Sequence, residues 1–174
     1  MIKGEKVRLR PIEEKDLELL RSWRNRYFDQ FFSGETLSKE QHRAWYDRYN
    51  ASGGRDTMFI IEALDGNGAV GTIALYDVSI ADRTAKLGRV LLLQEFRGKG
   101  YMDEAVKLLT NFAFDKLRLY KVRVEVFLDN TAALTIYAHA GYKTTSRPII
   151  LMEKVNHDHD PRKPIDMVDL GLED

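Results

Sequence analysis

The stretch RVLLLQEFRGKGYMDEA, residues 89–105, decides the fold expected for this chain. An apolar run typical of a buried strand comes first, and a helical period begins at Met102. Between them lies a short turn with two cations and the glycines Gly98 and Gly100. Glycines let a backbone approach a ligand closely, and the following helix presents free N–H groups and a positive dipole end at the same place. The pattern therefore predicts a strand, a phosphate-binding loop and a helix.

A nucleotide P-loop is excluded here, because that loop needs a longer glycine spacing and a Lys followed by Ser or Thr. In this chain Tyr101 follows Gly100. A glycine turn before a helix can also do no more than connect two elements. The phosphate-binding interpretation therefore needs support from the rest of the chain.

The composition is that of an ordinary globular protein. Of 174 residues, 44% are hydrophobic and 31% are charged, which suffices for one sizeable core. The 27 Lys and Arg balance the 27 Asp and Glu, so no overall field favours a nucleic acid or a membrane surface. Cys is absent, which excludes disulfides and thiolate chemistry and fits a reducing compartment. Because no apolar run approaches ~20 residues and no signal core is present, we expect one cytoplasmic domain, residues 1–174, with no nucleic-acid or membrane partner.

Hydrophobic patterning predicts a mixed order of strands and helices. Helices are expected between Pro11 and Asn25, from a capping box at Ser38 to Gly54, from Met102 onward, and over 132–140, where residues 129–131 cap the start and Gly141 the end. Strands are expected at 6–10 (an edge strand), 58–61, 70–78, 86–93, 122–128, 142–152 and 165–170, with a hairpin turn at 65–68. This order predicts a mixed, mostly antiparallel sheet of about seven strands with helices on both faces.

Together these features resemble the GCN5-related N-acetyltransferase (GNAT) superfamily. The resemblance rests on Arg97-Gly98-Lys99-Gly100, on Asn130 to Tyr137 with Gly141-Tyr142 closing the helix, and on the order of elements, so it covers nearly the whole chain. It implies an α/β (α+β) fold with a V-shaped split between the fourth and fifth strands, and an acetyl-CoA-dependent N-acetyltransferase. The branch it resembles includes amino-sugar and ribosomal-protein alanine N-acetyltransferases.

The resemblance also implies that acetyl-CoA lies in the split between strands 87–93 and 121–128. The strand backbone would line the pantetheine arm and the loop would hold the pyrophosphate. In the family the last loop residue is small, so the side chain of Met102 must point away from the phosphates. The cofactor-binding residues so implied are Leu91, Leu92, Leu93, Arg97, Gly98, Lys99, Gly100, Tyr101, Met102, Asn130, Ala133 and Tyr137.

Asn130 and Tyr137 lie two helical turns apart, so both can face one ligand. By resemblance, Tyr137 is the general acid that protonates the departing CoA thiolate and Asn130 contacts the cofactor. Asn130 is equally expected as the N-cap of the helix, which is compatible with that contact. The alternative for Tyr137 is a half-buried aromatic with an exposed hydroxyl.

The acceptor amine must lose a proton before it attacks the thioester, so a base or a chain of waters is needed. Many family members carry a carboxylate on the central strand, but residues 86–90 read KLGRV and contain no acid. The base therefore stays open among Asp77, Glu62 and His42. A carboxylate at a strand end is often only solvated, and a His beside a Trp is often only packed.

The acceptor side is expected at Trp23, Arg24, Asn25 and Phe31, where rings can stack on a base or sugar and the polar groups can bond phosphate or hydroxyls. The alternative is that Trp23 ends a core stripe and Arg24 lies on the surface. The sequence does not choose among a nucleotide-linked amino sugar, a polyamine, another small amine and a peptide N-terminus. The hydrophobic content permits a homodimer.

The segment His157-Asp158-His159-Asp160 is read as a polar loop, because adjacent residues of one loop rarely chelate a metal alone. No metal site is therefore expected. Two functions follow from the sequence. The first is N-acetyl transfer by direct attack in a ternary complex, without a covalent enzyme intermediate because Cys is absent. The second is a non-catalytic acyl-CoA-binding or regulatory module that kept the cofactor site and lost the base.

Overall fold

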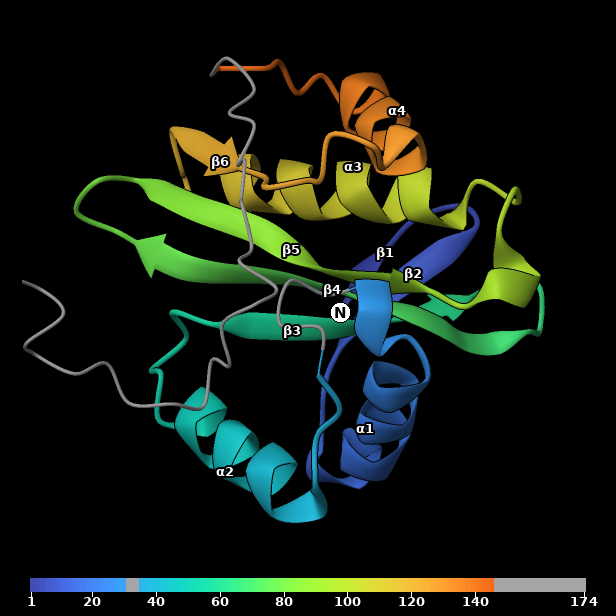
Figure 1. Ribbon diagram of the computed structural model, residues 1–174. Coiled ribbons are helices and arrows are strands. Elements are labelled where there is room, and N and C mark those ends of the chain that lie inside the picture. Colours follow the sequence, from blue (N-terminus) through green and yellow to red (C-terminus); the bar gives the residue numbers. More distant parts are fainter. Residues whose placement is uncertain (31–34, 146–174) are drawn as a thin grey trace, which may run out of the picture. The chain divides into compact units, whose positions relative to one another are not determined.

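One sheet, in which the strands follow each other in chain order, organises the protein (Figure 1). The computed structural model describes residues 1–30 and 35–145. Neighbouring strands pair antiparallel, except β5 and β6, which run parallel. In the described residues the strands are β1 (Ile2–Lys3), β2 (Val7–Pro11), β3 (Thr57–Ala63), β4 (Gly68–Ser79), β5 (Thr84–Leu92) and β6 (Lys121–Arg123).

Helices cover both faces of the sheet, with α3 and α4 on one side and α1 and α2 on the other (Figure 1). The parallel pair β5–β6 needs a crossover connection, and α3 supplies it. No helix in the described part of the chain is both long and apolar enough to cross a bilayer. The helices are α1 (Leu17–Arg26), α2 (Lys39–Asn50), α3 (Tyr101–Asp115) and α4 (Thr131–His139), with short 3-10 turns η1 (Glu14–Asp16), η2 (Phe28–Gln30) and η3 (Gln94–Phe96).

The core has one apolar layer on each side of the sheet. Alternate residues of β3 show this, because Ile61 packs with Val106 and Leu109 of α3 while Ile60 packs with Trp23 of α1. The predicted fold, a mixed and mostly antiparallel sheet with helices on both faces, is thus confirmed. Residues Met1–Lys143 form one compact unit, and the single domain over 1–174 stays a prediction.

Local signals in the sequence account for three of the helix ends in the described residues. Ser38 forms the predicted capping box with Gln41 at the start of α2. Asn130 is the N-cap of α4, where its side chain accepts a hydrogen bond from the amide of Ala133 at 3.1 Å. Gly141, just past α4, takes a φ of 86°, which favours glycine.

Four strand predictions need correction or lie, in part or wholly, outside the described residues. The edge strand predicted over 6–10 corresponds to β2, which is an internal strand. It pairs with β1 through Arg8 and Leu9 on one side and with β3 on the other, and Pro11 pairs only with β3. The strand predicted over 122–128 ends at Arg123, because β5 diverges there and leaves no strand to pair with. Residues 142–145 are not in a strand, and the rest of the strands predicted at 142–152 and 165–170 lies outside the described residues.

One carboxylate ties the N-terminal segment to the start of α3. Glu104 accepts hydrogen bonds from the amides of Glu5, Lys6 and Val7 at 2.8, 2.8 and 2.7 Å. Gly4 passes so close that a Cβ there would lie 2.7 Å from the Glu104 Cδ, so a larger residue would displace this carboxylate. The segment is thereby fixed against the first turn of α3.

We predict that Glu104→Ala lowers the free energy of unfolding by about 2 kcal/mol, because three amides lose a charged acceptor. Urea unfolding measures the effect. The matched control Glu95→Ala, at an exposed acid of η3, should change the free energy of unfolding by less than about 0.5 kcal/mol. Equally small losses in the two variants would contradict the anchoring role of Glu104.

Candidate active site

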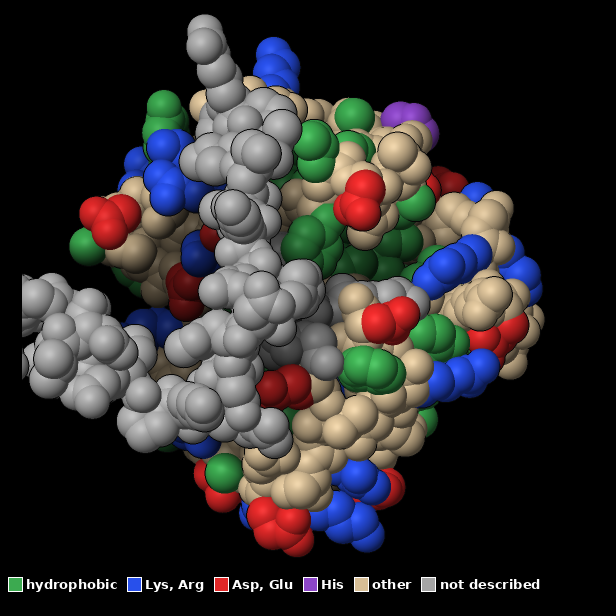
Figure 2. All heavy atoms as spheres, viewed as in Figure 1, with side chains coloured by type: hydrophobic (Ala, Val, Ile, Leu, Met, Phe, Trp, Pro, Cys, Tyr) green, Lys and Arg blue, Asp and Glu red, His purple; other side chains and the backbone are tan. Residues whose placement is uncertain are grey.

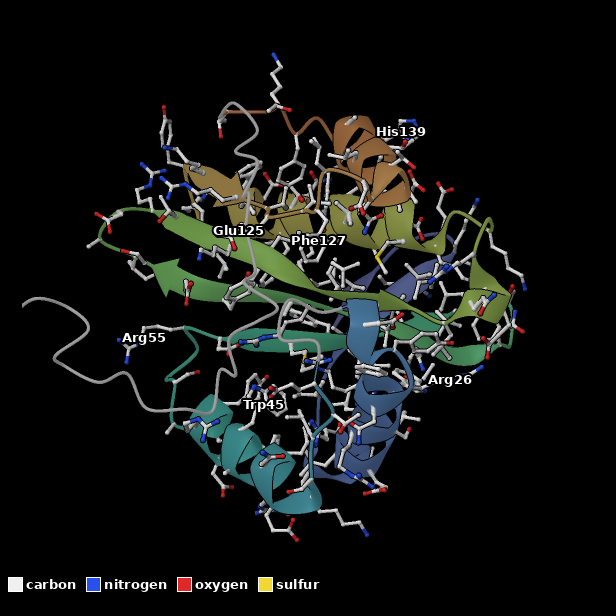
Figure 3. The ribbon with its side chains drawn as sticks, in the orientation of Figure 1. Arg26, Trp45, Arg55, Glu125, Phe127 and His139 are labelled. Atoms are coloured by element: carbon white, nitrogen blue, oxygen red, sulfur yellow. The ribbon has the colours of Figure 1, made fainter. Side chains whose placement is uncertain are left out.

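A groove opens where β5 and β6 part. The two strands pair only between Thr84–Lys86 and Lys121–Arg123. Strand β5 then continues to Leu92, while the segment that follows β6 leaves the sheet. The groove has a volume of about 670 Å³ and lies between β5 on one side and α4 with its preceding segment on the other. Figure 2 shows it as a recess lined by apolar side chains, and Figure 3 labels Phe127 on its wall. The predicted V-shaped split is therefore present, but it lies between the fifth and sixth strands and not the fourth and fifth, because the short strand β1 was not predicted.

A bulge in β5 divides its side chains between this groove and the other face of the sheet. Arg89 and Val90 together lie opposite Ile73 of β4, and Arg89 takes a φ of 49°. Such a bulge re-aims side chains, and here Val90 lines the groove while Arg89 lines a cavity on the face of α1 and α2. The Thr72 hydroxyl donates to the Arg89 carbonyl at 2.9 Å, which holds the bulge.

The glycine loop forms one end of the groove. Gly98 and Gly100 take φ values of 79° and 78°, a region that glycine adopts without steric cost, and both line the groove together with Arg97. Because α3 begins at Tyr101, the amides of its first turn have no acceptor within the helix. A guanidinium and a helix N-terminus thus meet at one place, which suits a diphosphate.

Lys6 holds this loop from behind. Its Nζ donates to the Lys99 carbonyl at 3.3 Å, and Lys6 does not line the groove whereas Gly100 does. The C=O and N–H of a trans peptide point in opposite directions. The contact therefore turns the Gly100 N–H away from Lys6. Since Glu104 fixes the Lys6 backbone, the N-terminal segment orients the loop.

Eight of the predicted cofactor residues line the groove and four do not. Leu93 packs on the other face of the sheet with α1, because side chains alternate along the chain there. The buried Tyr101 donates its hydroxyl to Asp65 in the β3–β4 turn, and Lys99 lies over the Phe96 ring. Tyr137 lies in the core below α4. The eight lining residues are Leu91, Leu92, Arg97, Gly98, Gly100, Met102, Asn130 and Ala133.

The groove also contains residues that the sequence reasoning missed. Asp29, Phe127 and Asp129 contribute to its lining. Asp29 lies in η2, a turn that no hydrophobic pattern marked. Met102 is nearly fully buried and borders the groove, so its side chain forms part of the wall.

The Tyr137 hydroxyl is held in its protonated form. The side chain is only 8% exposed, and its ring meets the edge of Tyr142 at 5.6 Å between centroids. Burial, with smaller contributions from Tyr142 and Tyr76, raises the pKa of Tyr137 to about 12. At neutral pH the phenol therefore carries a proton that it can donate.

The cavity on the other face of the sheet has a volume of about 200 Å³ and lies between β5, α1 and α2. Trp23 and Arg24, two of the residues expected on the acceptor side, line this cavity, and Leu91 lines both this cavity and the groove. Asn25 instead bonds the Leu37 backbone, donating to its carbonyl at 2.9 Å and accepting from its amide at 2.7 Å. Phe31 lies outside the described residues.

Of the three candidate bases, only His42 lines this cavity. Burial and the charge of Arg21 lower its pKa, although Glu18 opposes them, so its imidazole is neutral at pH 7. His42 is 6% exposed and stacks on Trp45 at 5.1 Å, a ring from α2 that also lines the cavity (Figure 3).

The two carboxylate candidates are held by cations. Burial alone would raise the pKa of Glu62, but hydrogen bonds from Arg10 and Arg8 outweigh it and lower the pKa. These bonds measure 2.9 and 2.6 Å. Asp77 is exposed and lies 3.4 Å from the Lys86 Nζ. Neither carboxylate lines the groove or the cavity.

Within residues 1–30 and 35–145, no three His, Asp or Glu side chains converge as metal ligands would. The loop His157 to Asp160 lies outside that part of the chain.

A family profile described as "Acetyltransferase (GNAT) domain" matches residues 6–143. The chain belongs to the GNAT family. It is accordingly an acetyl-CoA-dependent N-acetyltransferase, which confirms the transferase activity and the co-substrate expected from the sequence. The groove fits that co-substrate, because the Arg97 guanidinium, the glycine loop and the start of α3 meet at one end of it, and apolar side chains of β5 line its length.

Curated relatives are similar over most of their length. "Probable N-acetyltransferase YjcK" of Bacillus subtilis is 29% identical over 152 residues, which are 82% of this chain and 83% of the relative. "Spermidine N(1)-acetyltransferase" of Escherichia coli K12 is 27% identical over 146 residues, 78% of this chain and 72% of the relative. Neither name belongs to the amino-sugar or ribosomal-protein branch.

A solved structure shows the same fold. The spermidine N-acetyltransferase from Vibrio cholerae, in complex with CoA and spermine, superposes with a TM-score of 0.70 at 21% identity, covering 79% of this chain and 81% of that one. Another structure of the Vibrio cholerae spermidine N-acetyltransferase is described as dodecameric.

We predict that Gly100→Ala weakens CoA binding about tenfold. An L-residue is strained at this φ by about 1 kcal/mol, and the new Cβ would lie 3.0 Å from the Lys6 Nζ. Isothermal titration calorimetry with CoA measures the dissociation constant. Gly53→Ala is the matched control, because Gly53 has a φ of 62° with nothing within 4 Å of a Cβ. An equal loss of CoA affinity in that control would contradict the role of Gly100.

Proposed function

We propose that this GNAT enzyme acetylates the primary amine of a small molecule by direct attack in a ternary complex. The observation that carries the proposal is the wall shared at Leu91, which lines both the groove and the cavity. Two substrates held in these spaces approach β5 together. Bound acetyl-CoA would supply a thioester carbon for the attack and a thiolate as the leaving group. No Cys is available to form a covalent acyl-enzyme on sulfur.

His42 is the base in this proposal. Its position in the cavity places it on the acceptor side, and its lowered pKa leaves a lone pair free at neutral pH. It would take the proton of the incoming ammonium, directly or through a water. The alternatives Glu62 and Asp77 fit less well, because each already neutralises a cation.

Tyr137 is the acid in this proposal. It lies on α4, the helix whose N-terminal part borders the groove through Asn130 and Ala133. The buried phenol stays protonated at neutral pH, because its pKa is raised to about 12. It would deliver its proton to the departing thiolate, which is itself poorly solvated in an apolar channel.

The acceptor class is the finer part of the proposal. Among the four acceptor classes that the sequence left open, the curated relatives named for spermidine favour a polyamine. The homodimer that the hydrophobic content permits stays an open possibility of the sequence.

An acceptor screen tests the proposed function. The enzyme is incubated with acetyl-CoA and a panel of primary amines, and free CoA thiol is detected. Thiol release that rises with one acceptor supports the enzyme. Release by no amine, with intact CoA binding, would instead support the alternative, a non-catalytic acyl-CoA-binding module.

We predict that Tyr137→Phe lowers kcat about 100-fold, the ordinary size of a general-acid effect, without changing the dissociation constant of acetyl-CoA. Tyr142→Phe is the control. It removes a hydroxyl bonded to Thr110 at 2.8 Å and keeps the ring that packs on Tyr137, so kcat should stay near that of the wild type. Stopped-flow measurement of the chemical step decides. An unchanged rate in Tyr137→Phe would remove this residue from the mechanism.

We predict that kcat/KM does not change between pH 7 and pH 6.5 by more than the ordinary imidazole would allow and falls on further acidification, because burial lowers the pKa of His42 below the ordinary value of 6.5. His42→Gln should lower kcat/KM about 100-fold and abolish this acid limb. The pH profiles of both proteins provide the comparison. A limb that persists unchanged in His42→Gln would assign it to another group.

A further inference from the structure

The cavity between β5, α1 and α2 has mostly apolar walls. Three of its residues contribute aromatic rings, Trp23 from α1 and both His42 and Trp45 from α2. The planes of His42 and Trp45 differ by 15°, so the two rings form a stack. Walls of this kind favour an apolar ligand group, and a ring above all. Six of the ten described lining residues have apolar or aromatic side chains: Leu20, Trp23, Leu37, Trp45, Met58 and Leu91.

The charged side chains in this lining have partners within the protein. Arg89 pairs with both carboxylate oxygens of Asp56, one of which lies 2.7 Å from its Nη2. Arg24 has several contacts of its own, among them the Phe28 carbonyl at 3.5 Å from its Nη1. The polar groups of the cavity thus serve internal contacts, apart from His42, the proposed base. The acceptor is therefore selected by the apolar walls.

No carboxylate within residues 1–30 and 35–145 lines the cavity. A primary amine is an ammonium in water, and burial without an opposite charge favours its neutral form. That effect helps the reacting amine, which must lose a proton before it attacks. A second ammonium on the same molecule takes no part in the reaction, so its burial is only a cost.

The size of the cavity limits the group that the amine carries. A cavity of about 150 Å³ holds a benzene molecule, so 200 Å³ accommodates one ring with a short chain. Two fused rings with a side chain, or a sugar nucleotide, need more room. Because Leu91 lines both the cavity and the groove, an acceptor that reacts with a thioester in the groove has its amine at this wall.

We propose that the acceptor is a primary amine that carries one aromatic ring on a short uncharged chain, and that polyamines are poor acceptors. This rests on the proposed function, because it assigns the acceptor class of the same site. It selects a small amine from the four classes that the sequence left open. Spermidine, for which curated relatives are named, would bring further ammonium groups to apolar walls.

Four probes test the proposal on the full chain: phenethylamine, hexylamine, naphthylethylamine and spermidine. The wild type should acetylate phenethylamine with a kcat/KM about tenfold above that of hexylamine, because rings pack on rings. Naphthylethylamine should be about tenfold poorer than phenethylamine because of its size, and spermidine about a hundredfold poorer because of its charge. A spermidine value at or above that of phenethylamine would overturn the proposal, and equal values for hexylamine and phenethylamine would overturn its aromatic part.

Met58→Ala tests whether the ring lies in this cavity. Met58 lines it from β3 and is 8% exposed, so its removal enlarges the cavity. The ratio of kcat/KM for naphthylethylamine to that for phenethylamine should rise about tenfold. A ratio of two acceptors does not depend on how much of the variant is folded. An unchanged ratio would overturn the placement of the ring.

Ile61→Val is the control for this variant. Ile61 lies on the same strand but packs on the opposite face with α3, so its shortening leaves the cavity unchanged. The ratio of the two acceptors should stay within about twofold of the wild type, because side chains alternate between the faces of a strand. A rise equal to that of Met58→Ala would contradict the assignment of the cavity.

Calorimetry separates this proposal from the proposed function. With CoA bound, phenethylamine should bind the wild type about tenfold more tightly than spermidine, whether or not turnover occurs. Binding of phenethylamine without thiol release would contradict the catalytic proposal and support the acceptor site. Thiol release with spermidine, and no binding of phenethylamine, would contradict the acceptor site alone.

Discussion

The short parallel pairing of β5 with β6 is the constraint on which the remaining structure depends. Three residues of contact are enough to dock α3 as a crossover and to fix the strand ends. Beyond Arg123 the chain that formed β6 leaves the sheet. The residues of β5 that line the groove therefore have no paired strand on that side. Continued pairing would have filled this space with a strand. The site therefore exists because a sheet that could have been continuous is interrupted.

The bulge at Arg89 gives this interruption a second consequence. Two residues opposite one shift the alternation of side chains, so that neighbours on one strand serve different spaces. Val90 lines the groove and Arg89 lines the cavity. Leu91 lines both, so it forms a wall that the two spaces share. A strained φ at a bulky residue is costly, and here the Thr72 hydroxyl and the Asp56 carboxylate both hold the residue that adopts it.

The sequence predicted those parts of the site that local chemistry dictates. A φ near 80° favours glycine, so Gly98 and Gly100 identified the loop, and an Asn before a helix identified the cap of α4. Parts assembled from distant segments gave no such signal. The alternating Val122, Val124 and Val126 predicted a long strand, but the pairing ends at Arg123. Alternation of apolar residues shows which side of a strand is buried, and it does not show whether a neighbouring strand is there to pair with.

The same limit applies to the cavity and to the loop. Trp45 from α2 and Arg89 from β5 meet only after folding, and neither carried a motif. Leu93 and Tyr101 belonged to the predicted cofactor stretch, yet their side chains face other parts of the core. The strand and glycine-loop motif predicts the course of the backbone. The direction of each side chain depends in addition on bulges and turns that the motif does not encode.

The hydrogen bonds of Glu104 make the amino end of the chain part of the cofactor site in a mechanical sense. The amides of residues 5–7 are hydrogen-bonded to the first turn of α3, and the Lys6 ammonium is hydrogen-bonded to the loop beside it. The amino-terminal segment is therefore a structural support of the glycine loop, although none of its residues lines the groove.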